Sequence, residues 1–377
     1  MPTAPASESG ADRSALCAVL RGEALPLTDR QLDALHSLAT DHRVHVLLAE
    51  ALSHLPNDRA SSPPREALQE AARHAAIVEW LRAEDLRRVL AMLAAAGVPG
   101  ILVKGVALAY TCYEEPSHRP HVDIDLLIRR EDADRVRRVM EQGGYLAPHR
   151  VDGERVMHQF QFTRRLQNGA DCEYDFHWRV ANPELFAHVL TFDDLSASAR
   201  PVPALSEHAR APADLQSLFL ACIHRVAHHY DDDALVWLYD IHLLSRRLCE
   251  DDWDRFAALA QRTQTRTVCA HGLRTAAEAF GTLIPSSVLA RLSTKEHEPS
   301  ATFLAPTLRT IDVELSTLRQ LPTWRARAEL VWQHLFPRPA FIMSAYGVKR
   351  RAWLPVLYTH RAARGALRWM RPLAPPR

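Results

Sequence analysis

Two aspartates, Asp123 and Asp125, stand two residues apart in the apolar segment HVDIDLLI. Its aliphatic composition predicts a β-strand. Side chains alternate between the faces of a strand, so both carboxylates project from one face, and Val122, Ile124 and Leu126 are expected to face the core. Two like charges about 5 Å apart repel by roughly 3 kcal/mol at an effective dielectric of 20. A divalent cation that prefers oxygen, Mg²⁺ or Mn²⁺, would reverse this, although DxD is also common on strand faces that bind nothing.

A candidate phosphate-binding turn lies about twenty residues upstream of the two aspartates. The segment ILV, 101–103, reads as a short buried strand, Lys104-Gly105 forms a tight junction, and 106–112 reads as a short helix. A helix N-terminus after a glycine-containing turn offers free backbone N–H groups and the positive end of the helix dipole to phosphate. Lys104 adds a positive charge at the same place.

A third carboxylate is expected on a later strand. Two strands, 156–166 and 171–179, are predicted on either side of an Asn-Gly turn, which is a strong hairpin signal. The second of them carries Glu173 and Asp175 on one face. Two carboxylates on one strand and a third on its neighbour suit phosphoryl transfer with two metal ions.

With these motifs the chain resembles the nucleotidyltransferases of the DNA polymerase β type, which combine a strand, a Gly-containing turn, a short helix, an hDhDh strand and a later acidic residue. It is more narrowly similar to a bacterial family of uncharacterised nucleotidyltransferases. The matching elements are Lys104-Gly105, Arg119, the DIDLLI of 123–128 and the DFHW of 175–178. The flanking helices also look similar, so the resemblance spans roughly 15–345. The wider superfamily has Gly-Ser or Gly-Gly at the turn, where this chain has Lys-Gly.

The resemblance implies an α+β fold in which a small mixed β-sheet, the nucleotidyltransferase core, is flanked by N- and C-terminal helical regions. It implies that Asp123, Asp125 and Asp175 hold Mg²⁺ or Mn²⁺, and that Asp175 also helps to deprotonate the acceptor. Gly105 would cradle the triphosphate of an NTP co-substrate such as ATP, and Lys104 and Arg119 would neutralise it. Glu173, on the same strand face as Asp175, is the alternative third ligand.

The implied reaction moves a nucleoside monophosphate from an NTP to a hydroxyl, amine or phosphate of a small-molecule acceptor that the sequence does not identify. Two alternatives stay open. The chain could nucleotidylate a protein or an RNA, as toxin-like relatives of the superfamily do, or it could be an inactive scaffold that binds nucleotide without turnover.

Hydrophobic periodicity and breaks in it divide the chain into regions. The longest helical pattern, about 64–96, ends at Gly97-Val98-Pro99-Gly100, and two shorter helices are expected within 29–55. Further helices are predicted at 131–142, 213–230, 234–248, 252–262, 265–280, 323–335 and 351–370. The stretches 201–214 and 294–307 read as linkers. The expected parts are a disordered tail (1–13), an N-terminal helical region (14–84), the core (85–200), a helical domain lining the cleft (201–345) and a basic C-terminal helix and tail (346–377).

Several polar residues in the helical part permit more than one interpretation. His224 and His228 are four residues apart and share a helix face with His229 nearby, which suits a polar wall of the cleft, plain surface histidines or, less well, a zinc site. Asp240, between apolar neighbours, is either paired structurally or faces substrate. His177 and Trp178 either border the nucleotide base or belong to the core.

Composition sets outer bounds on the function. The formal net charge is +1, so bulk charge does not argue for a nucleic-acid partner. Six cysteines without CxxC spacing, and a start without a signal peptide's apolar core, favour a reducing cytoplasm. No uncharged apolar run suggests a membrane span. The basic stretch 349–377, which holds Trp353, Tyr358 and Trp369, suits nucleic acid, a membrane surface or simply a solvated helix.

Overall fold

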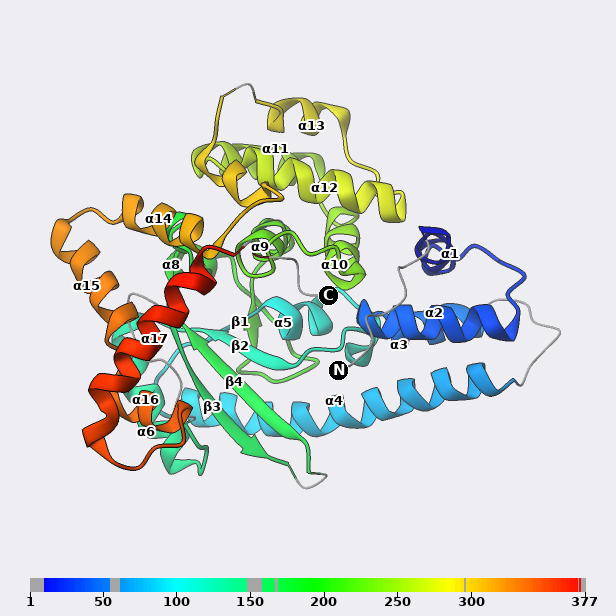
Figure 1. The fold of residues 1–377 in the computed structure, drawn as a ribbon. Coiled ribbons are helices and arrows are strands. Elements are labelled where there is room, and N and C mark those ends of the chain that lie inside the picture. The colour runs from blue at the N-terminus through cyan, green and yellow to red at the C-terminus, as the bar shows by residue number, and fades with distance from the viewer. Residues whose placement is uncertain are drawn as a thin grey trace.

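A computed structural model describes residues 10–54, 62–147, 158–166, 169–294, 296–371 and 373. The fold is α+β, as expected, with helices on both sides of a small mixed sheet and at both ends of the chain (Figure 1). The sheet has the order β1-β2-β4-β3, in which β2 and β4 run parallel and the other two pairs are antiparallel. Its strands are β1 (Ile101–Val103), β2 (Asp123–Leu127), β3 (Gln159–Arg165) and β4 (Asp171–His177).

The helices as far as residue 198 are α1 (Gly10–Leu20), α2 (Asp29–Asp41), α3 (His45–His54), α4 (Pro63–Ala95), α5 (Lys104–Thr111), α6 (Ala133–Gln142), α7 (Glu184–Ala187) and α8 (Phe192–Ser198). Those after it are α9 (Asp214–Ala227), α10 (Leu235–Ser245), α11 (Glu250–Arg262), α12 (Arg266–Phe280), α13 (Ser286–Leu292), α14 (Thr310–Gln320), α15 (Trp324–Leu335), α16 (Pro339–Ala345) and α17 (Leu354–Trp369). Helices α2 to α6, α9 to α12, α15 and α17 agree with helices predicted from the sequence, whereas α1, α7, α8, α13, α14 and α16 were not predicted.

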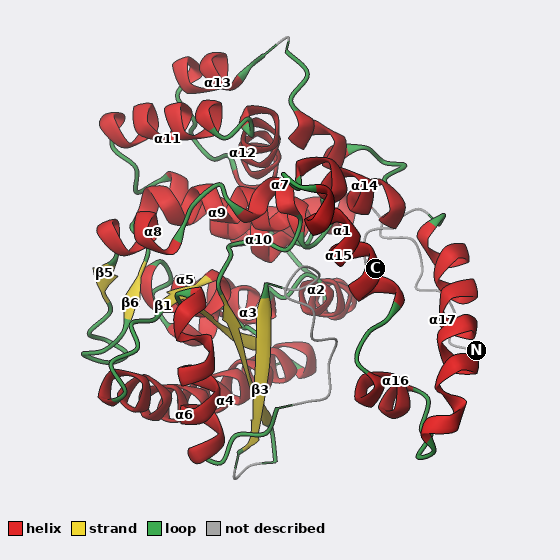
Figure 2. Cartoon of the chain, turned by 90° about the vertical axis from the view of Figure 1, so that its left-hand side faces the viewer, coloured by secondary structure: helices red, strands yellow, loops and turns green. Residues whose placement is uncertain are grey.

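Each face of the sheet has its own hydrophobic core. Ile124 and Leu126 of β2 pack with Tyr174 and Phe176 of β4 against α4 and α6. On the opposite face, the residues near the end of the sheet, Leu127 among them, join the core formed by α9 to α12. Figures 1 and 2 show α4 and α6 on one side of the sheet and α9 and α10 on the other. The carboxylates of β2 therefore point toward the helices that follow the sheet in sequence.

Three expectations from the sequence need correction. Val122 lies just before β2 and is 60% exposed, so only Ile124 and Leu126 face the core. The prediction of a disordered tail over 1–13 is wrong for residues 10–13, because α1 begins at Gly10. This helix buries Leu16 and Val19 in the core that it shares with α2 and α3. Residues 1–9 lie outside the described part.

The presumed linker 201–214 is also ordered. It contains Pro201 of β5 (Arg200–Pro201) and the whole of β6 (Arg210–Ala211), and these two strands pair as a small antiparallel sheet. The apolar residues of this short hairpin, among them Val202 and Leu205, join the core beneath the main sheet. Burial of these few side chains orders a segment whose proline content had suggested a boundary. Gln167 and Asn168 of the expected Asn-Gly turn lie outside the described residues, but β3 and β4 pair as a hairpin.

Among the described residues, no helix is both long enough and apolar enough to cross a membrane.

Candidate active site

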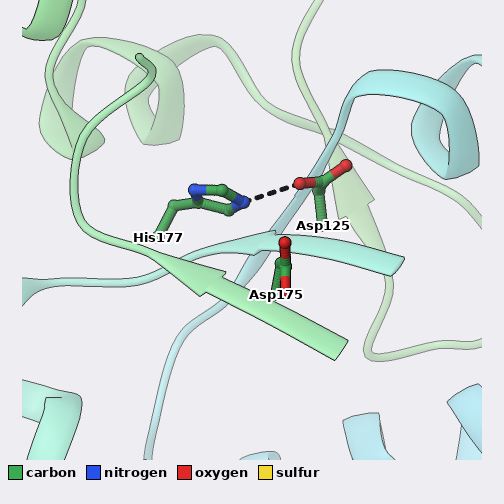
Figure 3. Close-up of side chains that lie close together, drawn as sticks. All are labelled: Asp125, Asp175 and His177. Carbon is green, nitrogen blue, oxygen red and sulfur yellow. Dashed lines mark hydrogen bonds and ion pairs between the residues drawn. The ribbon is translucent and has the colours of Figure 1, made fainter. Parts of the chain in front are cut away.

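The register of β2 and β4 brings the acidic residues of both strands together. Asp123 lies beside Glu173, and Asp125 lies beside Asp175. Paired residues on neighbouring strands project from the same face of the sheet, so all four carboxylates share one face. His177 is two residues beyond Asp175 and projects from that face as well (Figure 3). The structure thus brings together the three aspartates that the sequence singled out.

Asp125 is the electrostatic centre of this group. It is 3% exposed, and its Oδ1 accepts hydrogen bonds from Lys104 Nζ at 2.7 Å and from His177 Nε2 at 2.6 Å. Burial acts to raise the pKa of Asp125, but the charge of Lys104 and the hydrogen bond from His177 outweigh it and hold the pKa well below its ordinary value. Asp125 is therefore an anion that the fold has already matched with a cation.

For Asp123, the effects that disfavour a charged carboxylate outweigh those that favour it. Its pKa is raised, because burial and the neighbouring Asp125 both disfavour its charge, and the more distant Lys104 only partly compensates. A cation bound between the two carboxylates would remove this penalty. The site thus contains one satisfied carboxylate and one whose charge costs free energy.

Asp175 completes a compact set of candidate metal ligands. One ligand atom each from Asp125, Asp175 and His177 lie within 4.8 Å of one another, and all three residues are buried. Gln159 Nε2 donates to Asp175 Oδ2 at 2.8 Å, and Gln161 Nε2 holds Glu173 at the same distance. Carboxylate oxygens suit Mg²⁺ or Mn²⁺, and the Lys104 ammonium on Asp125 shows that this position attracts a cation, so the residues fit such an ion. Asp175 rather than Glu173 lies beside Asp125.

The pKa of His177 is lowered, mainly by burial and then by the charge of Lys104, which outweigh the opposing effect of Asp125. A neutral His177 donates its Nε2–H to Asp125 and orients that carboxylate. Sequence reasoning placed His177 either at the base or in the core and missed this role. The available signal was its i+2 spacing from Asp175 on a strand.

The Lys104-Gly105 turn lies directly above the acidic face. Lys104 adopts a left-handed backbone conformation, φ 58°, which is uncommon for a residue with a side chain. Strain of this kind is typical of functional sites. The helix α5 begins here without a side-chain cap, so its first N–H groups are available to a ligand.

Gly105 is closely surrounded by neighbouring side chains, which leave little room for a side chain at this position. A Cβ added to it would lie 3.1 Å from His121 Cβ and 3.5 Å from Arg119 Nη1. Replacement of Gly105 by alanine would therefore disturb the packing of the turn against His121 and Arg119.

Arg119 is part of a buried network that joins the core to the helical region. Its Nε and Nη2 donate to the two carboxylate oxygens of Asp240 at 2.8 and 2.7 Å. Tyr113 OH donates to the same carboxylate at 2.7 Å. Asp240 is thus paired structurally, and the guanidinium of Arg119 is fixed beneath the turn that carries Gly105.

The histidines of α9 and the turn after it line the neighbouring wall. His224 borders a small cavity of about 30 Å³, together with Lys104, Gly105, Arg119, Ser217 and Asp240. His229 approaches His224 with their Nε2 atoms 3.0 Å apart and stacks on Trp237 with ring centroids 3.8 Å apart. Burial, followed by the charge of Lys104, holds the pKa values of His224 and His228 well below the ordinary value. These residues form a neutral polar wall next to the site.

Two half-buried histidines, His229 and His242, are expected to make the protein less stable in mild acid. The pKa of His229 is lowered to about 4, by burial and then by Arg43, and that of His242 is lowered to about 4, by burial and then by Arg246. In the unfolded chain these groups bind protons near pH 6.5, so their contribution is complete above that pH and is lost as the pH falls toward 4. Within this pH range, each of the two histidines should add about 1.4 kcal/mol per pH unit to the slope of the unfolding free energy against pH.

Thermal or urea unfolding between pH 7.5 and 5 measures this slope. The variant His229→Phe keeps an aromatic ring over Trp237 but cannot be protonated. The slope of its unfolding free energy against pH should therefore be smaller by the contribution of one histidine. Asp125 and Glu184, whose pKa values are lowered, affect the pH dependence of stability only below about pH 4.5, outside the range of the histidines. Stability that stays constant between pH 6.5 and 5 would contradict the prediction.

Trp178 lies outside this group. It is partly buried beside Phe160, and the guanidinium of Arg130 lies 4.9 Å from its ring centroid. It borders a separate open pocket of about 670 Å³ at the ends of β2 and β4, together with Arg129, Arg179 and Glu184. Trp178 and His177 therefore face different surroundings although they are neighbours in sequence.

Comparison with known proteins agrees with this geometry. A family model described as "Uncharacterised nucleotidyltransferase" matches residues 28–281, which is about two thirds of the chain. The match includes every residue of the acidic face, the Lys104-Gly105 turn, Arg119 and the histidines of α9. No curated protein matches the chain.

Proposed function

This chain belongs to the family of uncharacterised nucleotidyltransferases, and is by class a transferase; from that premise we propose the reaction, the metal and the residue roles. The chain moves a nucleoside monophosphate from an NTP to a hydroxyl, amine or phosphate of a small-molecule acceptor, with Mg²⁺ or Mn²⁺. The observation that carries this is the placement of Asp123, Asp125 and Asp175 on one face of two adjacent parallel strands. We assign the core to the DNA polymerase β type on the same ground.

In the proposed step, an oxygen or nitrogen of the acceptor attacks the α-phosphorus of the NTP. The bond between the α-phosphorus and its bridging oxygen breaks, pyrophosphate leaves, and Asp175 helps to remove the acceptor's proton. The metal, when bound, neutralises charge on the phosphates and aligns the attacking and leaving groups. Asp123, Asp125 and Asp175 would hold it, and His177 fixes the orientation of Asp125.

Phosphate binding is assigned to the turn before α5. The uncapped N–H groups of α5 and the close backbone at Gly105 would receive the triphosphate, as helix N-termini do in many nucleotide sites. Lys104, whose ammonium group pairs with Asp125, would supply positive charge to the phosphates. Arg119 contributes positive charge and holds the turn, but its pairing with Asp240 keeps it in place.

The deep position of the acids favours a small acceptor. Asp125 and Asp175 are 3% and 7% exposed, and α9 and α10 lie on the same side of the sheet as these acids (Figure 1). We propose that the core (85–200) supplies the acids and the turn, and that the helical domain (201–345) supplies the wall through His224 and Asp240. A protein or RNA acceptor would need a more open approach to the same carboxylates.

The test is incubation of the protein with each NTP labelled at the α-phosphate, Mg²⁺ or Mn²⁺, and a cell lysate separated into small molecules and macromolecules. Label in the small-molecule fraction, lost in Asp175→Asn, supports the proposal. Label in protein or RNA would shift the acceptor class. The absence of label in all fractions, with retained NTP binding, would make the chain a binding scaffold.

A further inference from the structure

Exposed apolar side chains gather near the C-terminal end of the chain. Of the fourteen large apolar side chains that are well exposed among the described residues, nine lie between 315 and 370. They are Leu315, Trp324, Val331, Trp332, Leu335, Phe336, Trp353, Val356 and Met370. Singly exposed apolar residues are ordinary, but such a concentration marks an interaction surface.

Part of this set forms a continuous stripe on α15. Trp324, Ala328, Val331 and Leu335 follow one another at intervals of four, three and four residues, which places them on one helix face. The opposite face buries Ala326 and Leu330. Ala328, Val331 and Leu335 of this stripe border a groove of about 530 Å³ between α14 and α15. Trp324, Val331 and Leu335 are 79%, 43% and 43% exposed.

The apolar stripe is connected to the last helices. Trp332 lies against Phe336 with ring centroids 4.4 Å apart, and Phe336 contacts Tyr358 of α17 at 5.7 Å. Tyr358 OH also donates to the carbonyl of Pro337 at 2.6 Å. Figure 1 shows α15, α16 and α17, coloured orange to red, together on one side of the molecule. We call the exposed faces of these three helices the C-terminal surface.

The charge of this region is almost entirely positive: from Trp324 to the end of the chain, Glu329 is the one acid against eleven Lys and Arg residues. From Leu330 to the end of the chain there is no Asp or Glu, and there are nine Lys and Arg residues. The rest of the chain has 37 Lys and Arg against 45 Asp and Glu, which gives it a net charge of −8. Within the described residues, the exposed cations include Arg338, Lys349, Arg350, Arg351, Arg364 and Arg371. The overall charge of +1 hides this separation.

We propose that the C-terminal surface binds the interfacial region of a membrane rich in anionic lipids, an attachment distinct from the transfer reaction. Tryptophan and aliphatic side chains next to cations are the groups that interfacial helices insert among acyl chains and headgroups. A nucleic acid fits less well, because leucine, valine and methionine offer no ring for bases to stack on. A second copy of the chain fits poorly too, because two surfaces of like charge repel.

The test is co-sedimentation of the full chain with phosphatidylcholine vesicles and with vesicles that contain phosphatidylglycerol as well. Binding should need the anionic lipid and should weaken as salt rises from 0.05 to 0.5 M. The triple variant Lys349→Ala, Arg350→Ala, Arg351→Ala should bind about 100-fold more weakly, since each surface cation contributes about a factor of five. The double variant Trp324→Ala, Trp332→Ala should lose about tenfold or more.

Matched substitutions elsewhere serve as controls. Trp80 on α4 has the same 62% exposure as Trp332, so Trp80→Ala should bind as the wild type does. Replacement of Arg73, Arg165 and Arg200, each well exposed, removes the same charge from other surfaces and should also have little effect. Thermal melts of all variants check folding.

Three results would overturn the proposal. The first is equal binding to neutral and anionic vesicles, or none to either. The second is binding that the two C-terminal variants retain. The third is a preference for another partner, seen as tight binding to a single-stranded oligonucleotide that anionic vesicles fail to displace, or as a dimer in light scattering that Trp332→Ala dissociates.

Discussion

Replacing Asp123 or Asp125 with asparagine should abolish metal-dependent NTP binding in both cases, yet change the stability of the metal-free protein in opposite directions. Asp125 is buried and receives hydrogen bonds from Lys104 and His177. Asp125→Asn loses the interaction with the ammonium group, and a lost hydrogen bond to a charged group costs about 1.5–3 kcal/mol. The lowered pKa of Asp125 agrees with this loss of stability, because it shows that the folded state favours the charged carboxylate.

Asp123 should behave differently, because the folded state disfavours its charge. Burial and the nearby Asp125 raise its pKa, so Asp123→Asn removes a repulsion and should leave stability unchanged or slightly increased. Asparagine keeps the size of the side chain, which separates this electrostatic effect from any cavity. The sequence alone treats the two aspartates alike, as a repelling pair, and the ion pair with Lys104 is the reason that Asp125 behaves differently.

Urea unfolding without metal, together with calorimetric titration of a non-hydrolysable NTP in Mg²⁺, measures both effects. Each variant should bind the analogue at least 100-fold more weakly, which corresponds to about 2.7 kcal/mol. Asp134→Asn, an exposed acid on α6, is the matched control and should alter neither quantity. If the two variants lose stability equally, the contrast between the carboxylates is wrong. If NTP binding persists in both, the metal site is wrong.

Sequence patterns predicted the local parts of the site well. The strand containing Asp123 and Asp125, the helix that starts at the Lys104-Gly105 turn and the strand containing Asp175 all follow from short-range periodicity and turn chemistry. Each depends on neighbours within about ten residues along the chain. The α+β fold follows from the order of these elements together with the family resemblance.

Contacts between distant segments could not be read from the pattern. The parallel pairing of β2 and β4 sets Asp125 beside Asp175, and this register depends on tertiary packing rather than on either strand alone. His177 therefore reaches Asp125 across 52 residues of chain. The partner of Arg119 is 121 residues away, on a helix whose composition gave no sign of what its single acid would face.

The pairing of Arg119 with Asp240 leads to the second large effect. Asp240→Ala should destabilise the protein by about 3–5 kcal/mol, because it leaves the buried guanidinium of Arg119 without its carboxylate. Arg119 and Asp240 are 5% and 3% exposed, so solvent cannot replace the lost partner. The double variant Arg119→Met, Asp240→Leu removes both charges and should recover most of the loss, since an apolar pair of similar volume often matches a buried ion pair. Urea unfolding of the single and double variants measures both changes.

The double variant also decides what Arg119 does for the nucleotide. If Arg119 contributes charge to the triphosphate, the refolded double variant should still bind the NTP analogue at least tenfold more weakly than the wild type. If Arg119 only supports the turn that carries Gly105, restored stability should bring restored affinity. Leu238→Ala on the same helix is the control for general loosening. This fully buried residue belongs to the core shared with α1, α2 and α3, so its loss should lower stability without a specific loss of NTP affinity. Recovery of neither stability nor affinity would show that the ion pair specifies the docking of α10 onto the core.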